Sequence, residues 1–255
     1  MLLTIDVGNT NTVFGLFDGD NLLRSWRLST LRGRTIDECG VLVRNLFALD
    51  GYDVHAVRAV IVASVVPPLD PTIQGMVERY FSTEAVFVTS ANAGITVLYD
   101  TPRDVGADRI VDAVAALDRY GAPAIVVDLG TATTFDAITR DGEYGGGLIA
   151  PGIEVSASAL IERAAKLPRI DIRKPDTLIG RTTVDSLQSG FFWGYVSLVD
   201  GILDRMKREL GDDAIVIATG GMAHFVRDEL RHPTELDVDL TLRGLRLVAA
   251  QLGVG

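Results

Sequence analysis

Two short segments place a carboxylate where an apolar strand ends and a small, polar turn begins. They are Asp6-Val-Gly-Asn-Thr-Asn-Thr12 and Asp128-Leu-Gly-Thr-Ala-Thr-Thr134. In such a turn glycine lets the chain approach a ligand closely, and consecutive N–H groups with nearby hydroxyls present several donors. These donors suit phosphate oxygens. A carboxylate at the head of the turn repels phosphate, but it can hold Mg²⁺ or another cation, usually through water, that bridges to the phosphate.

A single turn of this kind has a simpler interpretation, in which its Asp and Asn only satisfy the backbone of a hairpin. The two segments, however, share the Asp, an apolar residue, the Gly and a Thr at the seventh place. Internal similarity of this kind favours two similar halves that face each other across a cleft. No G-x-x-x-x-G-K-[ST] is present and no G-x-G-x-x-G follows a strand, so the phosphate loop is of a different type.

A third carboxylate stands in Gly106-Ala-Asp-Arg109, at the predicted start of a helix. The helix dipole favours an acid at this place, which is a sufficient structural reason for Asp108. Its functional interpretation is a base that accepts the proton of an attacking hydroxyl, while Arg109 holds an anionic group of the substrate or the phosphoryl group. Phosphoryl transfer needs mainly positioning and charge stabilisation. Asp108 for the hydroxyl, Arg109 for an anionic group and a cation for the phosphates would therefore be sufficient for this reaction.

The elements that must position these residues follow the same order twice. Residues 2–7, 12–17 and 22–28 read as hairpin strands, and Thr35 with Glu38 forms a capping box that begins a helix reaching about Leu49. The remaining predictions are strands at 57–65, 85–88, 124–129, 133–138, 144–150, 214–218 and 235–238, and helices at 71–80, 107–120, 153–166, 183–210 (capped by Thr183), 222–230 and 241–252. We therefore expect an α/β protein with two domains, 1–106 and 107–255, each a mixed sheet flanked by helices.

Composition limits the class of protein further. The 255 residues are 47% hydrophobic, the formal net charge is −10, and the basic residues are scattered, which argues against a nucleic-acid surface. A polyphosphate ligand approaches against this mean field, so its site needs backbone N–H groups, local arginine or a metal ion. The single Cys39, the absence of an export signal and the short apolar run 59–66 lead us to expect a cytoplasmic protein without a membrane partner.

Seven segments resemble the type III pantothenate kinase family, in order and over nearly the whole chain. They are IDVGNTNTVFG (5–15), YDTPRDVGADR (99–109), VVDLGTATTFDAI (126–138), GGGLIAPGIEVSASAL (145–160), LPRID (167–171), IGRTTVDSLQSG (179–190) and ATGGMA (218–223). The resemblance implies the fold of the superfamily of actin, sugar kinases and Hsp70, in which two ribonuclease-H-like domains enclose ATP in a cleft. It also implies ATP-dependent phosphorylation of pantothenate, the first step of coenzyme A biosynthesis.

The resemblance implies a role for particular residues. Asp108 is the proton acceptor, Asp128 binds a monovalent cation, K⁺ or NH₄⁺, and Asp6 holds Mg²⁺ through water. ATP contacts Asp6, Val7, Gly8, Asn9, Thr10, Asn11, Thr12, Val13 and Thr131, and pantothenate contacts Tyr99, Gly106, Ala107, Asp108, Arg109 and Thr183. Family members are homodimers with pantothenate near the subunit interface, and they are insensitive to feedback by coenzyme A. This chain departs from the family at Thr101, where Asn is common.

Two alternatives stay open at this point. One is a kinase of the same fold that phosphorylates a different small hydroxyl compound. The other is a regulatory or accessory protein that keeps the fold without catalysis, since the family resembles the Bvg accessory factor. Loss of the acids at positions 6, 108 or 128 would favour the second alternative, and all three acids are present.

Overall fold

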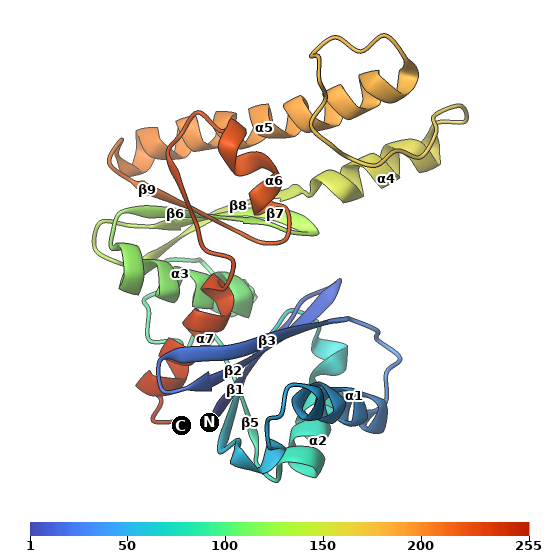
Figure 1. Ribbon diagram of the computed structural model, residues 1–255. Helices are drawn as coiled ribbons and strands as arrows, with labels where there is room; N and C mark the ends of the chain where they lie inside the picture. Colours follow the sequence, from blue (N-terminus) through green and yellow to red (C-terminus); the bar gives the residue numbers. More distant parts are fainter. Residues whose placement is uncertain (255) are drawn as a thin grey trace. The chain divides into compact units, whose positions relative to one another are not determined.

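Two five-stranded mixed sheets carry the fold in the computed structural model, which describes residues 1–254 (Figure 1). In the first sheet, with the order β3-β2-β1-β4-β5, two antiparallel hairpins are followed by two parallel strands. Its strands are β1 (Leu2–Val7), β2 (Asn11–Asp18), β3 (Asn21–Ser29), β4 (Ala59–Ser64) and β5 (Ala85–Phe87).

The second sheet repeats this topology. Its order, β10-β9-β6-β7-β8, again places antiparallel hairpins on one side of the first strand and parallel strands on the other. The strands are β6 (Ala124–Leu129), β7 (Ala132–Ile138), β8 (Tyr144–Pro151), β9 (Ile215–Thr219) and β10 (Thr234–Leu236). The α/β class, with two mixed sheets flanked by helices, is therefore confirmed.

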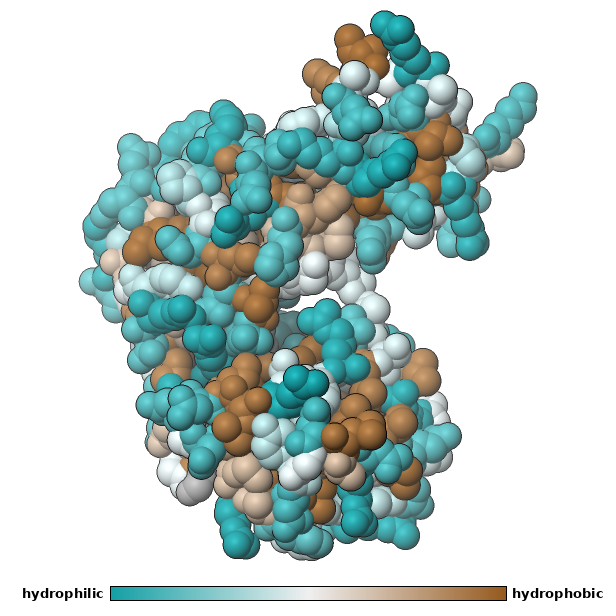
Figure 2. All heavy atoms as spheres, in the orientation of Figure 1, coloured by the Kyte–Doolittle hydropathy of each residue, from teal (hydrophilic) through white to brown (hydrophobic). Residues whose placement is uncertain are grey.

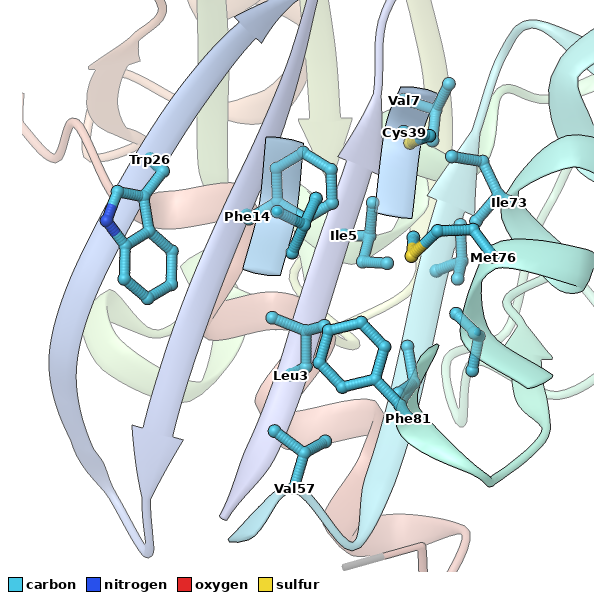
Figure 3. Packing of buried hydrophobic residues seen from close by; sticks show 14 of the residues in the cluster. Leu3, Ile5, Val7, Phe14, Trp26, Cys39, Val57, Ile73, Met76 and Phe81 are labelled. Atoms are coloured by element: carbon cyan, nitrogen blue, oxygen red, sulfur yellow. The ribbon is translucent and has the colours of Figure 1, made fainter. Parts of the chain in front are cut away.

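Helices α1 (Ile36–Leu49) and α2 (Asp70–Phe81) cover one face of the first sheet. The predicted capping box begins α1: Thr35 Oγ1 accepts the Glu38 N–H, and the Glu38 carboxylate accepts the Thr35 N–H at 2.8 Å. Figure 3 shows Leu3, Ile5 and Val7 of β1 on the same side of the sheet as Ile73 and Met76 of α2. Because side chains alternate along a strand, Asp6 of β1 lies on the opposite face.

The second sheet has its own helices, α4 (Ile153–Arg163), α5 (Thr183–Leu210) and the short α6 (Ala223–Val226). Val127 and Leu129 of β6 belong to one core cluster with Phe192 and Val196 of α5. Asp128 lies between Val127 and Leu129 in β6, so its side chain is on the opposite face of the sheet from α5. Asp6 and Asp128 thus each lie on the face of their sheet that is turned away from the helices packed against its core.

Contacts between residues divide the chain differently from the predicted boundary at 106/107. One unit comprises Met1–Arg119 and residues 239–254, and the other comprises Tyr120–Val238. All but the last residue of α3 (Ala107–Tyr120) and the whole of α7 (Leu240–Gln251) belong to the first unit. Gly244 of α7 packs directly on the backbone of Val111 in α3, which explains why these two helices stay together.

Two local predictions were wrong. Thr182, rather than Thr183, caps α5, because its hydroxyl oxygen accepts the Asp185 N–H at 3.1 Å. The helix predicted at 222–230 breaks into α6 and the 3₁₀ turn Arg227–Glu229. The other 3₁₀ turns are Val54–Ala56, Pro67–Leu69 and Pro102–Asp104.

The surface fits the charged composition. Figure 2 shows one face on which hydrophilic residues predominate and hydrophobic residues form small groups. Within residues 1–254, no helix has the length and apolar character needed to cross a membrane.

Candidate functional site

The first turn joins β1 to β2 and is closed by its own backbone. Gly8 donates its N–H to the Asn11 carbonyl at 3.0 Å, and a β-carbon on Gly8 would lie only 3.0 Å from the same oxygen. Glycine therefore fits the close approach of the two strand ends, where a β-carbon would need its neighbour to shift. Asn9 and Thr10 at the tip are exposed. An exposed turn tip of this kind can present N–H groups to an anionic ligand.

The second turn joins β6 to β7 and is one residue shorter. Gly130 donates its N–H to the Ala132 carbonyl at 3.0 Å. In the first sheet Val7 pairs with Thr12, whereas in the second sheet Leu129 pairs with Thr133. The structural counterpart of Thr12 is therefore Thr133, and the match of Thr12 with the seventh residue of the second segment was wrong, because that turn has one residue fewer.

A pair of hydroxyl groups lies on the core-helix side of each turn, partly buried in the first unit and buried in the second. In the first unit the Thr12 and Thr30 hydroxyls are 2.9 Å apart. In the second unit the Thr133 and Tyr195 hydroxyls are 2.7 Å apart. Burial, with a smaller contribution from the charge of Asp128, raises the pKa of Tyr195 to about 12, so this phenol remains protonated.

Two further glycine turns close around Asp128 and Thr131. Gly220, at φ +88°, lies against the Asp128 carboxylate, where a β-carbon would collide with Oδ1. Gly152, directly before α4, donates its N–H to the Thr131 carbonyl at 3.0 Å, and a β-carbon there would lie 2.5 Å from that oxygen. Gly152 and Gly220 are thus places where the backbone closely approaches the second turn.

Asp108 lies in the first turn of α3 and is partly buried. Its Oδ1 accepts the Arg109 N–H at 2.8 Å. Burial raises the pKa of the Asp108 carboxyl above its ordinary value, although the Arg109 N–H and the Arg109 charge act in the opposite direction. A carboxylate with a raised pKa is a stronger base than an exposed one, which suits the abstraction of a hydroxyl proton.

Val65 connects Asp108 to the strand end beside the first turn. A β-carbon on Gly106 would lie 2.5 Å from Asp108 Oδ1 and 3.2 Å from Val65 Cγ1, so both side chains pack close to the α-carbon of Gly106. Val65 in turn donates its N–H to the Val7 carbonyl at 3.1 Å. The predicted base therefore lies at the same edge of the first sheet as the end of β1, the strand that leads into the predicted phosphate turn.

The other predicted substrate residues are placed as follows. Arg109 is buried, with 8% of its surface exposed, and Ala107 precedes Asp108 in α3. Tyr99 is 39% exposed in the loop between β5 and α3, and Thr183 is exposed at the first residue of α5. The structure brings residues 106–109 together with Val65, whereas the roles of Tyr99 and Thr183 stay predictions.

Sequence reasoning missed Val65, Thr30 and Tyr195. Val65 stands at the end of the apolar run 59–66, which signalled only a buried strand. Thr30 and Tyr195 meet partners that are 18 and 62 positions away, respectively. No local pattern marks such a pair, because it arises from the packing of elements that are separate in the sequence.

The sequence predicts two cation sites, one at Asp6 and one at Asp128. Among residues 1–254, no group of three or more His, Cys, Asp or Glu side chains is arranged to hold a metal ion. The assignment of Mg²⁺ to Asp6 through water stays a prediction. The bare α-carbon of Gly220 lies against the Asp128 carboxylate, and the assignment of a monovalent cation to Asp128 stays a prediction.

The repeated sheet topology, with an acid-headed turn in each half, defines the class of actin-like ATPase folds, and similar solved structures confirm it. A conserved putative Baf family transcriptional activator from Campylobacter jejuni superposes with a TM-score of 0.63 at 20% identity, covering 98% of each chain. MreB 5 of Spiroplasma citri bound to AMPPNP gives a TM-score of 0.53 at 10% identity, covering 99% of this chain and 96% of that one. Both likenesses concern the fold alone.

Comparison with sequences identifies the family. The profile described as Type III pantothenate kinase matches residues 2–205. The type III pantothenate kinase of Myxococcus xanthus is 52% identical over 97% of each chain. That of Koribacter versatilis is 48% identical over 97% of this chain and 94% of the relative. The chain belongs to the type III pantothenate kinase family, so the family and the enzyme class predicted from the sequence are confirmed.

Proposed function

We propose that this protein transfers the γ-phosphoryl group of ATP to the primary hydroxyl of pantothenate and forms 4′-phosphopantothenate, the first step of coenzyme A biosynthesis. The family membership of nearly the whole chain supports the substrates. The observation that carries the mechanism is the contact of Asp108 with Gly106, at the sheet edge reached by β1. A placed carboxylate with a raised pKa is what a hydroxyl nucleophile requires.

In the proposed step the pantothenate hydroxyl oxygen attacks the γ-phosphorus in line with the leaving oxygen of ADP. One O–P bond forms, the bond between the γ-phosphorus and the β,γ-bridging oxygen breaks, and the hydroxyl proton passes to the Asp108 carboxylate. The Asp108 carboxylate occupies the space beside the bare α-carbon of Gly106. Arg109 neutralises anionic charge on pantothenate or on the transferring group.

The proposed ATP-binding residues are those of the first turn, 6–13, together with Thr131. Its exposed tip binds phosphate oxygens, whereas Thr12 supports the turn from behind, since its hydroxyl is paired with that of Thr30. Asp6 is the proposed water-mediated ligand of Mg²⁺, and Asp128 the proposed ligand of K⁺ or NH₄⁺. When bound, these cations offset the negative charge of the phosphates on a protein whose own net charge is −10.

The residues proposed to bind pantothenate are Tyr99, 106–109 and Thr183. The family resemblance also supports a homodimer with pantothenate near the subunit interface. The single cysteine is consistent with a cytoplasmic location.

The test is a coupled assay of ADP release by the purified protein with ATP, Mg²⁺ and K⁺. Pantothenate should give far higher turnover than a panel of sugars and glycerol, and Asp108→Asn should reduce turnover roughly 10²–10⁴-fold. High turnover with another acceptor would instead indicate a kinase of different specificity. No turnover with any acceptor would support the non-catalytic alternative.

A further inference from the structure

Both turns of the proposed site are held from behind in the same way. In each unit a threonine on the strand after the turn points to the side of the core helices, and its hydroxyl meets a second hydroxyl from elsewhere in that unit. Thr12 is 6% exposed and Thr133 is fully buried. Because water cannot readily replace a buried partner, each pair is a specific and directional contact.

Thr30 holds the first turn at two points. Its N–H donates to the Thr10 carbonyl at 2.8 Å, and its hydroxyl lies 2.9 Å from that of Thr12. Thr10 is at the exposed tip, and Thr12 begins the pairing of β2 with β1. Thr30 itself directly follows β3. It therefore ties the tip and the base of the turn to a neighbouring strand end.

Tyr195 holds the second turn from α5. Its phenol is 2.7 Å from the Thr133 hydroxyl, and only 6% of Tyr195 is exposed. Thr133 pairs in register with Leu129, the residue that follows Asp128. A change at the phenol is therefore transmitted to the strand end that carries Asp128 without any contact between Tyr195 and a bound cation.

We propose that Thr30 and Tyr195 are positioning residues, each of which fixes one ligand-binding turn through the hydroxyl pair that it forms with a buried threonine. This inference rests on the proposed function, because it assigns the first turn to ATP phosphates and the second to the monovalent cation. Neither residue touches the reacting atoms. Thr30 sets the geometry of phosphate binding, and Tyr195 sets the geometry around Asp128.

The first test compares Thr30→Val, which keeps the shape and removes the hydroxyl, with Thr30→Ser, which keeps the hydroxyl. One net hydrogen bond corresponds to about a 2–10-fold change in an equilibrium constant. We expect Thr30→Val to raise the KM for ATP by about that factor, with kcat and the KM for pantothenate within twofold of wild type. Thr30→Ser should restore the KM for ATP. Titration of a fluorescent ATP analogue without pantothenate should show the same order of affinities.

The second test uses Tyr195→Phe, Thr133→Val and the double variant. Each single change should raise the K⁺ concentration for half-maximal activity by about 2–10-fold, and the double variant should be no worse than the more affected single variant, because one pair is removed in all three. A second measurement does not depend on activity. The melting temperature is followed as KCl is added, and the same titration with NaCl is the control for ionic strength. Tyr80→Phe is the matched control, since the Tyr80 hydroxyl bonds Asp37, on the surface of the other unit.

The outcomes separate this inference from the proposed function. Lower melting temperatures with unchanged KM for ATP and unchanged K⁺ response would mean that the hydroxyl pairs serve stability alone, and would overturn the inference. Additive effects of Tyr195→Phe and Thr133→Val would also contradict it. If wild-type protein fails to phosphorylate pantothenate, the proposed function fails, whereas analogue binding and KCl stabilisation still decide the roles of Thr30 and Tyr195.

Discussion

The space beside the α-carbon of Gly106 is occupied by the carboxylate of Asp108. A β-carbon built on Gly106 would lie 2.5 Å from Asp108 Oδ1, well inside van der Waals contact. The glycine two positions before the proposed base therefore leaves free the space that the carboxylate occupies. The same β-carbon would lie 3.2 Å from Cγ1 of Val65, the residue that follows β4.

Gly106→Ala should displace the Asp108 carboxylate and lower kcat for pantothenate phosphorylation. We expect a loss of at least about tenfold, because a misplaced base loses much of the roughly 10²–10⁴-fold contribution of proton transfer. Steady-state kinetics measures the loss, and circular dichroism checks the fold. Gly33→Ala is the control, since no atom lies within 4 Å of a β-carbon there. Equal kcat values in the two variants would show that Asp108 tolerates displacement.

The activity of wild-type protein should fall at acid pH because of Asp108. Burial raises the pKa of its carboxyl, so the basic form is lost as the pH falls through this raised value. The acid limb of kcat/KM against pH should therefore lie above about 3.9, the ordinary value for aspartate. A pH profile in constant ionic strength measures it. An acid limb at or below the ordinary value would argue against Asp108 as the titrating group.

Asp108→Asn should raise the melting temperature at pH 7–8 while it removes activity. The raised pKa means that the folded state disfavours the charged form, a penalty that is present above the folded pKa and absent below the unfolded one. The neutral amide avoids this penalty, so the gain should shrink as the pH falls towards 4. Asp104→Asn, at an exposed acid in the preceding 3₁₀ turn, controls for the change of net charge. A destabilised Asp108→Asn at pH 8 would contradict the argument.

Gly220→Ala should weaken the response to K⁺. The new β-carbon would collide with Asp128 Oδ1 and lie 2.8 Å from the Leu129 backbone. Wild-type activity should depend on K⁺ or NH₄⁺ and fall in Na⁺, whereas the variant should need at least about tenfold more K⁺, or lose activity, because the carboxylate is pushed aside. Gly121→Ala separates this effect from backbone strain, since Gly121 also has positive φ, +85°, but no neighbour within 4 Å.

Gly244→Ala should destabilise the first unit by about 1–3 kcal/mol, the usual cost of forcing extra atoms into a packed contact. A β-carbon there would collide with the Val111 carbonyl oxygen and lie 3.1 Å from Val111 Cβ. Urea unfolding measures the change. In the control Gly190→Ala, on an exposed position of α5 with no neighbour within 4 Å, alanine should stabilise the helix by up to about 1 kcal/mol. Similar values for the two variants would show that α3 and α7 are not closely packed.

Much of the fold was predictable because it is encoded locally. The capping box at Thr35, the hairpin turns and the alternation of apolar residues in the strands each depend on residues a few positions apart. The predictions failed where packing competes with local preference. The helix expected at 222–230 ends early in a 3₁₀ turn. The domain boundary expected at 106/107 also differs from the two units defined by contacts between residues. The reason is that α7, which follows the second unit in the chain, packs with the first unit.

The sequence by itself determined the family, the two acid-headed turns and the candidate base, since these are features of residue type and spacing. Only the tertiary structure decided that Thr12 corresponds to Thr133, that the Asp108 carboxylate lies beside the α-carbon of Gly106, and that the hydroxyls of Thr30 and Tyr195 meet those of Thr12 and Thr133. The reason is physical: turn and strand preferences act between neighbours in the chain. Burial, a raised pKa and a hydroxyl pair 62 positions apart exist only once separate elements have packed together.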